Sequence, residues 1–363
     1  MIEPVAAAFE RKDYRTAAKL LKQLLKQSPE NPWVQFYLGR LHEVWGKYEQ
    51  AEKVYRQLLQ NTTNVKIITQ ARQALQRLQE LEQQQRKRAI MEASKEGDRA
   101  EFAVLVLEPV SKEFKTQAAQ KLARIMQMDT YSARLLLPSR GWRLFRSGAL
   151  AELKFYGQQL RKAGVACFWA TLAALEKIQV FQVCYFTQFY PKAAVVCQNQ
   201  AKELGYLYFD WSEVKGRVQG LLPIFEEVVD RDVRGKLKRK TQTQDYLQFC
   251  DLHLPGKQCI LRLYDCGYQF QQGIELGSCA SEKSTIAKNW SNLLALIDQK
   301  LPEIKIWSDF TPFAETALEQ TEVLDQIQPH IYLLRREKTN WDPAFQLYSG
   351  LIFLSLSSTQ AEH

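Results

Sequence analysis

The first eighty residues repeat themselves with a period of 34, and this repeat constrains the fold more than any other feature. The segment KDYRTAAKLLKQLLKQSPEN aligns with GKYEQAEKVYRQLLQNTTN, so that Tyr14 falls on Tyr48 and Ala17 on Ala51. Apolar residues recur at helical spacing in both copies. The repeat therefore predicts antiparallel helix pairs joined by short turns.

Residues 3 to 62 resemble the tetratricopeptide repeat family, with one full repeat after a partial one. In WVQFYLGRLHEVWGKYEQAEKVY, Gly39 permits close helix packing, Ala51 keeps the helix crossing tight, and Tyr55 fills the groove between the helices. The following segment, KIITQARQALQRLQELEQQQRKRAI, has the polar outer face of a capping helix. We expect a helical domain over residues 1–90 and a charged linker over 91–100.

The family resemblance implies a docking module that presents a concave surface to a protein partner. With so few repeats, an intramolecular brace or a dimer contact is an equally open interpretation.

Composition indicates a globular protein without a catalytic or metal site. The length of 363 residues is enough for two or three domains. The chain carries a net charge of +9, and 46% of its residues are hydrophobic. No basic leader or membrane-length apolar run occurs, so we expect a cytoplasmic location. The seven cysteines form no Cys-x-x-Cys pair and are interpreted as reduced core thiols.

The motif search favours a protein that is not an enzyme and that needs no cofactor. Four scattered histidines give little material for a zinc site or a catalytic dyad. The sequence has no phosphate-binding P-loop, nucleophile elbow, zinc-protease motif or dinucleotide-binding turn.

Residues 101–175 alternate between strand and helix patterns. We expect a strand over Phe102–Leu107, two amphipathic helices, a longer helix closed by Gly164, and a strand over Ala166–Trp169. This order is similar to the C-terminal domain of the ribosomal stalk protein and to the Clp protease adaptor fold. The resemblance implies a small α/β domain and no activity.

Residues 176–358 are expected to form a larger domain for ligand binding and dimerisation. Three aromatic, β-branched segments predict strands, GRVQGLLPIFEEVV predicts a helix, and Pro255-Gly256 predicts a hairpin turn between two further strands. GYQFQQGIEL and HIYLLRRE are interpreted as strands, and STIAKNWSNLLALIDQKL as a helix capped by Ser284. The chain as a whole is predicted to be α+β, with a mainly antiparallel sheet in this domain.

The stretch RDVRGKLKRK holds six cationic residues and one acid, Asp232. Gly235 interrupts any helix there, so we expect a loop that projects several cations into one neighbourhood. A phosphate-bearing ligand is the natural complement of such a cluster. The predicted ligand-binding residues are Arg231, Asp232, Arg234, Arg239 and Lys240.

A second basic stretch, LPSRGWRLFRSG, alternates arginines with aromatic residues and is interpreted as a loop. Guanidinium groups bind phosphates or guanine edges, and an aromatic ring can stack on a base. The candidate residues are Arg140, Trp142, Arg143 and Arg146. In the alternative interpretation, Trp142 and Phe145 fill the core while the arginines point into solvent.

The repeats and both basic stretches together resemble a cyanobacterial family of tetratricopeptide proteins that includes a cyclic di-GMP receptor. The resemblance implies a homodimer that binds cyclic di-GMP at its interface and relays the signal to a protein partner such as a transcriptional regulator. Arg231, Asp232 and Arg234 are of the types that such a site needs, although the combined Arg-x-x-x-Arg and Asn/Asp-x-Ser-x-x-Gly pattern of PilZ receptors is absent. The alternative is a basic protein that binds nucleic acid or the ribosome.

Overall fold

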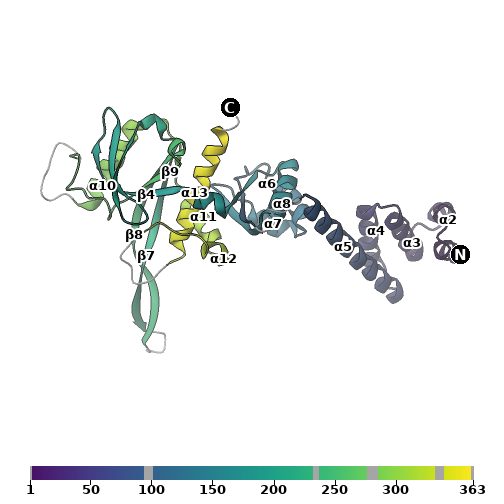
Figure 1. The fold of residues 1–363 in the computed structure, drawn as a ribbon. Coiled ribbons are helices and arrows are strands. Elements are labelled where there is room, and N and C mark those ends of the chain that lie inside the picture. The colour runs from purple at the N-terminus through teal and green to yellow at the C-terminus, as the bar shows by residue number, and fades with distance from the viewer. Residues whose placement is uncertain (1, 94–100, 232–236, 276–284, 332–338, 361–363) are drawn as a thin grey trace. The chain divides into compact units, whose positions relative to one another are not determined.

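The structure, a computed structural model, describes residues 2–93, 101–231, 237–275, 285–331 and 339–360, with side chains in these ranges except at 92–93, 226–231, 237–241 and 358–360. The chain forms two compact units, Met1–Ala93 and Ser94–His363 (Figure 1). The second unit contains the predicted domain boundary at residue 175.

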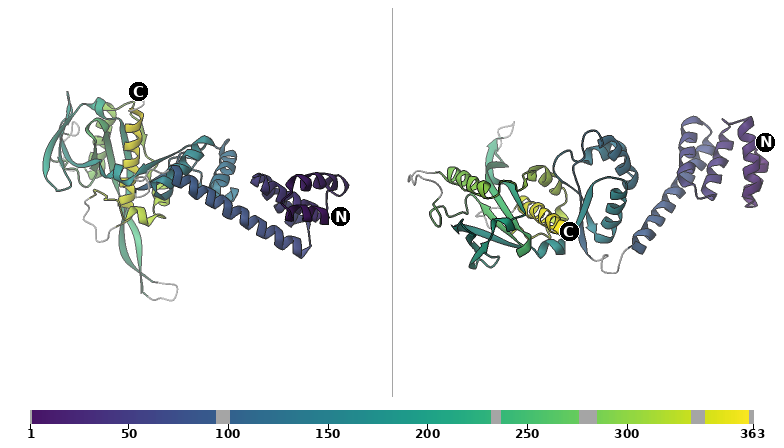
Figure 2. Two further views of the ribbon diagram at one scale, coloured as in Figure 1. Left: turned by 45° about the vertical axis from the view of Figure 1, so that its right-hand side comes forward. Right: turned by 90° about the horizontal axis from the view of Figure 1, so that it is seen from above.

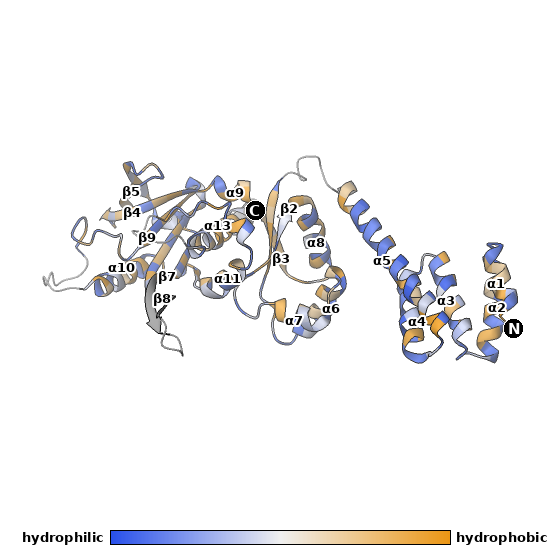
Figure 3. Ribbon diagram, turned by 90° about the horizontal axis from the view of Figure 1, so that it is seen from below, coloured by the Kyte–Doolittle hydropathy of each residue, from blue (hydrophilic) through white to orange (hydrophobic). Residues whose placement is uncertain are grey.

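The first unit is helical throughout its described residues, as the repeat predicts. Figure 2 shows its short helices followed by one long helix. The helices are α1 (Glu3–Glu10), α2 (Tyr14–Gln27), α3 (Pro32–Val44), α4 (Tyr48–Asn61) and α5 (Val65–Ala93). Hydrophilic residues line much of α5 (Figure 3), in agreement with its predicted capping role.

Tyr55 holds the second helix pair together. Its side chain is fully buried, and it packs so closely on Gly39 that a Cβ atom at residue 39 would lie 2.4 Å from the tyrosine ring. The predicted role of Tyr55 between the helices is confirmed. Asp13 caps α2 by accepting a hydrogen bond from the backbone N–H of Thr16 at 3.1 Å, which explains where that helix begins.

The second unit begins with a three-stranded antiparallel sheet in the order β2-β1-β3. Its strands are β1 (Phe102–Leu107), β2 (Arg143–Ala149) and β3 (Cys167–Thr171), and its helices are α6 (Lys115–Met126), α7 (Thr130–Leu136), α8 (Leu150–Lys162) and α9 (Leu172–Glu176). The strand and helix order matches the prediction except for one additional strand, β2, and one additional short helix, α9.

The interpretation of residues 143–149 as a basic loop is wrong, because these residues form β2. Leu144 is buried while Arg146 is exposed, because a register shift opposite Leu105 and Val106 of β1 places a bulge between these two residues. The sequence analysis did not recognise this strand, because the charge of its arginines suggested a solvated loop.

A seven-stranded sheet forms the rest of the unit, in the order β10-β7-β8-β9-β4-β5-β6. The strands are β4 (Gln179–Gln188), β5 (Ala193–Gln198), β6 (Leu204–Phe209), β7 (Gly216–Arg231), β8 (Leu237–Leu254), β9 (Cys259–Tyr264) and β10 (Ile306–Trp307). All neighbours are antiparallel except β4 with β9 and β10 with β7. The predicted α+β class with a mainly antiparallel sheet is confirmed.

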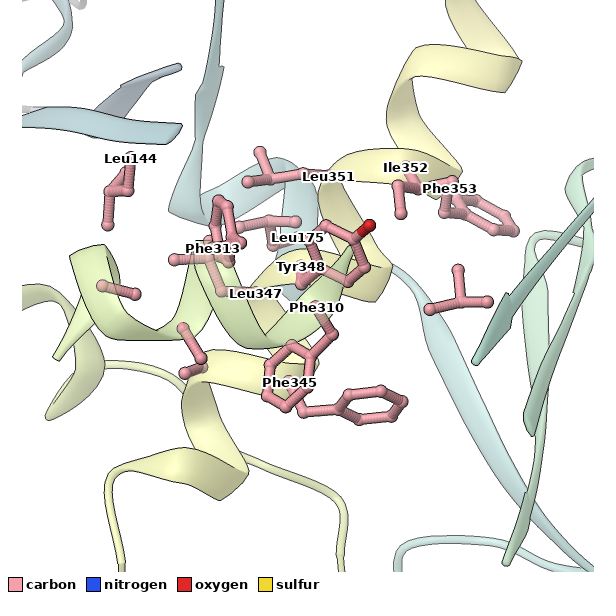
Figure 4. Close-up of a cluster of buried hydrophobic side chains, with 14 of the residues drawn as sticks. Leu144, Leu175, Phe310, Phe313, Phe345, Leu347, Tyr348, Leu351, Ile352 and Phe353 are labelled. Carbon is pink, nitrogen blue, oxygen red and sulfur yellow. The ribbon is translucent and has the colours of Figure 1, made fainter. Parts of the chain in front are cut away.

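Helices cover both faces of this sheet. They are α10 (Ile286–Lys300), α11 (Phe310–Ala317), α12 (Thr321–Leu324) and α13 (Trp341–Gln360), with 3₁₀ turns η2 (Trp211–Glu213) and η3 (Pro255–Lys257). One core contains α10 residues such as Trp290, and another contains residues of α11 and α13. Figure 4 shows Phe310 and Phe313 of α11 beside Phe345 and Tyr348 of α13.

The small and large sheets share one hydrophobic core. Val104 and Val106 of β1 lie in the same buried cluster as Val218 of β7 and the apolar face of α13. The ring of Trp142, just before β2, lies 4.8 Å from the ring of Trp307 on β10. The two sheets are therefore packed as one body.

Two secondary-structure predictions in this unit are wrong. GRVQGLLPIFEEVV forms β7 rather than a helix, and residues 267–275 contain turns rather than a strand. Gly216, Gly220 and Pro223 weaken a helix at this place, and pairing with β8 decides the outcome. The predicted hairpin between β8 and β9 is present, with η3 as its turn.

Two further predictions concern residues that lie wholly or mostly outside the described ranges. Most of HIYLLRRE and the proposed cap Ser284 lie outside the described residues. The described cap of α10 is Thr285, whose hydroxyl accepts a hydrogen bond from the backbone N–H of Lys288.

Candidate functional site

The outer parts of β7 and β8 form a two-stranded arm. The two strands pair from Gly216 opposite His253 as far as Arg231 opposite Leu237. The neighbouring strands stop much earlier, because β9 pairs with β8 only from Phe249 inward and β10 pairs with β7 only at its start. The arm is seen below the sheet in Figure 1 and extends about 35 Å at a rise of roughly 3.3 Å per residue.

The base of the arm is fixed in the core. Leu222 and Leu247 lie opposite each other in the register, and both are buried. At Gly220 a Cβ atom would lie 2.6 Å from the ring of Phe345, so β7 runs close against α13 at this point. The direction in which the arm leaves the sheet is therefore set by packing at its base.

The predicted ligand-binding residues of the first basic stretch belong to the arm. Arg231 is the last residue of β7, and Arg239 and Lys240 lie in β8, opposite Val229 and Val228. The predictions for Asp232 and Arg234 lie outside the described residues. The interpretation of this whole stretch as a loop after a helix is wrong, since β8 includes its last four residues, Leu237 to Lys240.

Charge is divided between the two strands of the arm. The first part of β8, from Leu237 to Gln244, has three cations and no acid, whereas β7 from Glu226 to Asp230 has three acids and no cation. Cross-strand pairing places Asp230 opposite Lys238. The described part of the arm thus pairs a basic segment of β8 with an acidic segment of β7.

In the second basic stretch, Trp142 belongs to the core. It is 7% exposed, and its ring lies 4.6 Å from Phe168 and 4.8 Å from Trp307. Gly141, with φ +61°, lies so close to Asp309 that a Cβ atom would be 2.7 Å away. These contacts correspond to the alternative in which Trp142 fills the core, and they leave it no open face for a nucleotide base.

The three arginines of this stretch differ in their surroundings. Arg146 pairs with Glu152 at 2.9 Å and lies over the ring of Tyr156 at 5.5 Å. Arg140 is exposed and Arg143 is half-buried, so these two remain candidates for an anion contact.

Sequence reasoning missed a buried polar cluster that lies between β8, β9 and α13. Arg262 on β9 donates to both carboxylate oxygens of Asp251 on β8, at 2.8 to 3.3 Å. The hydroxyl of Ser349 on α13 donates to the same carboxylate at 2.6 Å and lies 3.0 Å from Nε2 of His253. The signal was the presence of charged residues within the apolar strands QFCDLHL and CILRLYD.

The cluster connects α13 to the large sheet, and its side chains are buried where no substrate can reach them. Asp251, His253 and Ser349 are fully buried, and burial lowers the pKa of His253 to about 4. The carboxylate binds arginine and serine rather than orienting the histidine, unlike a nucleophilic triad. Its hydrogen bonds fix α13 against β8 and β9.

Thiol chemistry gives no alternative site. The described cysteines are free, and five of the six are buried. Burial raises the pKa of Cys250 and Cys259 to about 11, so these thiols stay protonated near neutral pH. No group of His, Cys, Asp and Glu in the described ranges is suited to hold a metal ion.

The repeat unit exposes a possible docking face on α3. Arg40 lies 4.9 Å from the ring centre of Phe9 and 5.9 Å from that of Tyr37. Tyr48, at the start of α4, is also exposed. Tyr55 is buried and takes no part in this face.

Comparison with known proteins identifies only the repeats. Residues 8–66 match the tetratricopeptide repeat family. No curated protein and no solved structure matches the chain. Across the described residues, no helix has the length and apolar composition needed to cross a bilayer.

Proposed function

We propose that the chain is a non-enzymatic binding protein with two contact surfaces. The tetratricopeptide repeats dock a protein partner, and the β7–β8 arm binds a phosphate-bearing ligand. The observation that supports this proposal is the arm itself, in which β8 carries three cations and no acid from Leu237 to Gln244.

Nucleic acid is the ligand that the shape of the arm favours. A two-stranded β-ribbon fits the major groove of a duplex, and lysine and arginine supply most contacts to phosphate. The arm approaches phosphate with β8, which carries Lys238, Arg239 and Lys240, rather than with the acidic part of β7, Glu226 to Asp230. The formal charge of +9 adds long-range attraction.

Cyclic di-GMP is the second candidate, favoured by the composition of the stretch from Arg231 to Lys240. Arg231 and Arg234 are suited to phosphate and guanine edges, and Asp232 can accept from guanine N1 and N2. This proposal retains a ligand shared between two copies of the chain and a signal passed to a protein partner such as a transcriptional regulator.

The ligand proposals are tested by titrating a labelled nucleic-acid duplex and cyclic di-GMP into the full chain at several salt concentrations. For nucleic acid, Arg239→Ala with Lys240→Ala weakens binding and reduces the salt slope by about 2. The control pair Lys121→Ala with Arg124→Ala removes the same charge from α6 and leaves the slope nearly unchanged.

The outcomes separate the candidates. Tight binding of cyclic di-GMP with a shallow salt slope selects the second ligand. Loss of that binding only in Arg140→Ala with Arg143→Ala moves the site to the second basic stretch. If neither ligand binds at physiological salt, the arm has another role.

Docking by the repeats is tested through Arg40, which contacts two aromatic rings on the face of α3. Arg40→Glu is expected to release a partner purified with the wild-type protein, because a carboxylate at this position repels the partner groups that the guanidinium of Arg40 attracts. Arg72→Glu, on the exposed side of α5, is the matched control.

A further inference from the structure

Strand β6 is an open edge of the seven-stranded sheet. It is the last strand in the sheet order, and among the described residues only β5 pairs with it. The side chains of Leu204, Tyr206 and Tyr208 lie on the same face of the strand. They are apolar or aromatic and largely exposed, at 66%, 67% and 62% respectively. Proteins normally blunt such an edge with charges, proline or a bulge.

None of these protective devices occurs in β6. From Leu204 to Phe209 the strand has no charged residue and no proline, and its pairing with β5 runs without a register shift. A flat, uncharged edge with exposed aromatic residues is suited to pairing with another strand.

The hydrogen-bond phase of the β5–β6 hairpin shows which backbone groups face outward. The backbone N–H of Asn199 donates to the carbonyl of Glu203 at 3.1 Å, so these residues form a hydrogen-bonded pair. In an antiparallel ladder such pairs alternate with pairs that make no hydrogen bond. The backbone groups of Leu204, Tyr206 and Tyr208 consequently point away from β5, toward the open edge.

We propose that β6 pairs with β6 of a second copy of this chain, antiparallel and centred on Tyr206. In this register Tyr206 lies opposite Tyr206 of the partner, and Leu204 lies opposite the partner's Tyr208. All outward backbone groups then find partners, and all three exposed side chains meet apolar neighbours across the two-fold axis. The two seven-stranded sheets become one continuous sheet.

Residues beside the strand support a second copy as the occupant. In the same register Lys202 lies opposite Asp210 of the partner, whose carboxylate also pairs with Lys192 of its own chain at 3.1 Å, so each end of the paired strands gathers opposite charges. Beside Gly205 a Cβ atom would meet nothing within 4 Å, and this space faces the partner's Leu207. Registers shifted by two residues leave one of the exposed side chains without an apolar partner and separate the charges.

This inference stands independently of the ligand bound by the arm. It also differs from the dimer implied by family resemblance, because it assigns the contact to one strand and one register.

The first experiment is light scattering of the full chain at micromolar concentration. The wild type is expected at twice the monomer mass, and Tyr206→Arg at the monomer mass, because two arginines then meet on the axis. Tyr131→Arg, at an exposed tyrosine on α7, is expected to stay dimeric. Circular dichroism must show that the Tyr206→Arg variant is folded. A monomeric wild type overturns the proposal.

The second experiment tests the register by disulfide formation. With Cys266 and Cys279 replaced by serine, Tyr206→Cys is expected to cross-link two copies, since opposed Cα atoms in a hydrogen-bonded pair lie about 5.5 Å apart. Tyr208→Cys alone is expected to cross-link far less, because it opposes residue 204. Equal cross-linking at both positions, or a dimer that survives Tyr206→Arg, excludes this interface.

Discussion

Arg262 and Asp251 form a bidentate ion pair between directly opposite residues of β8 and β9, with both side chains at most 1% exposed. A further bond from Nη1 of Arg262 reaches the carbonyl of Pro329 at 2.8 Å. The pair thus connects the centre of the large sheet to the segment that precedes α13.

We predict that Arg262→Ala lowers the free energy of unfolding by about 3–5 kcal/mol, because it leaves the Asp251 carboxylate buried without its counterion. The double variant Asp251→Leu with Arg262→Met is expected to lose less than the single variant. Lys257→Ala, which breaks a half-exposed pair with Glu213, is expected to cost at most about 1 kcal/mol. Urea unfolding measures all three, and an Arg262→Ala loss no larger than that of Lys257→Ala contradicts the prediction.

Stability is expected to fall as the pH drops from 6.5 toward 4. Burial lowers the pKa of His253 and of His330 to about 4, below the ordinary value of 6.5. Between these values the unfolded chain binds protons that the folded chain does not, so acid favours unfolding by up to about 1.4 kcal/mol per pH unit for each group.

The pH effect is measured as the slope of unfolding free energy between pH 5 and 6.5, a range above most carboxylate titrations. His330→Asn is expected to reduce the slope, and asparagine tolerates the positive φ of this position. An unchanged slope in a variant that lacks both histidines would show that other groups cause the effect.

Trp142→Ala is expected to destabilise the second unit by about 3–5 kcal/mol, because it opens a cavity between Phe168 and Trp307. Arg140→Ala with Arg143→Ala is expected to change stability little, since Arg140 is exposed and Arg143 is half-buried. Thermal unfolding compares the two variants. Similar losses in both would show that Trp142 does not anchor this core.

In the repeat unit, Gly39→Ala is expected to cost about 1–3 kcal/mol, since the added methyl group overlaps the ring of Tyr55. Gly46→Ala is the control, because a Cβ atom there meets nothing within 4 Å and only the positive φ opposes it. Protease digestion of α3 and α4 in the full chain measures the difference. Faster digestion of the Gly46→Ala protein would contradict the packing argument.

Much of the fold could be predicted from local pattern. The repeat predicts the helix pairs, and the apolar pattern of β1 gives its bounds as the structure has them. Strand β7 was missed because its apolar spacing fits helix as well as strand, and its assignment depends on pairing with β8. Strand β2 was missed because two of its seven residues are arginines, whose charge suggested a loop.

The candidate site was only partly accessible to sequence reasoning. A local excess of charge identified the residues of the arm, but the arrangement of one basic and one acidic strand requires the β7–β8 register. The pairing of Asp251 with Arg262 likewise depends on which residues of β8 and β9 lie opposite each other. For Trp142 the sequence was ambiguous, because an aromatic residue among arginines has the same pattern whether it binds a base or fills a core.

The contact between Trp142 and Trp307 limits how this chain can be divided in evolution. A recombination event that exchanged residues 101–175 would bring in a new small sheet without the β10 and α13 surfaces that cover it. Such hybrids are expected to misfold unless both segments are inherited together. We expect recombination to be tolerated between the two compact units rather than within the second, because both of its sheets share one core.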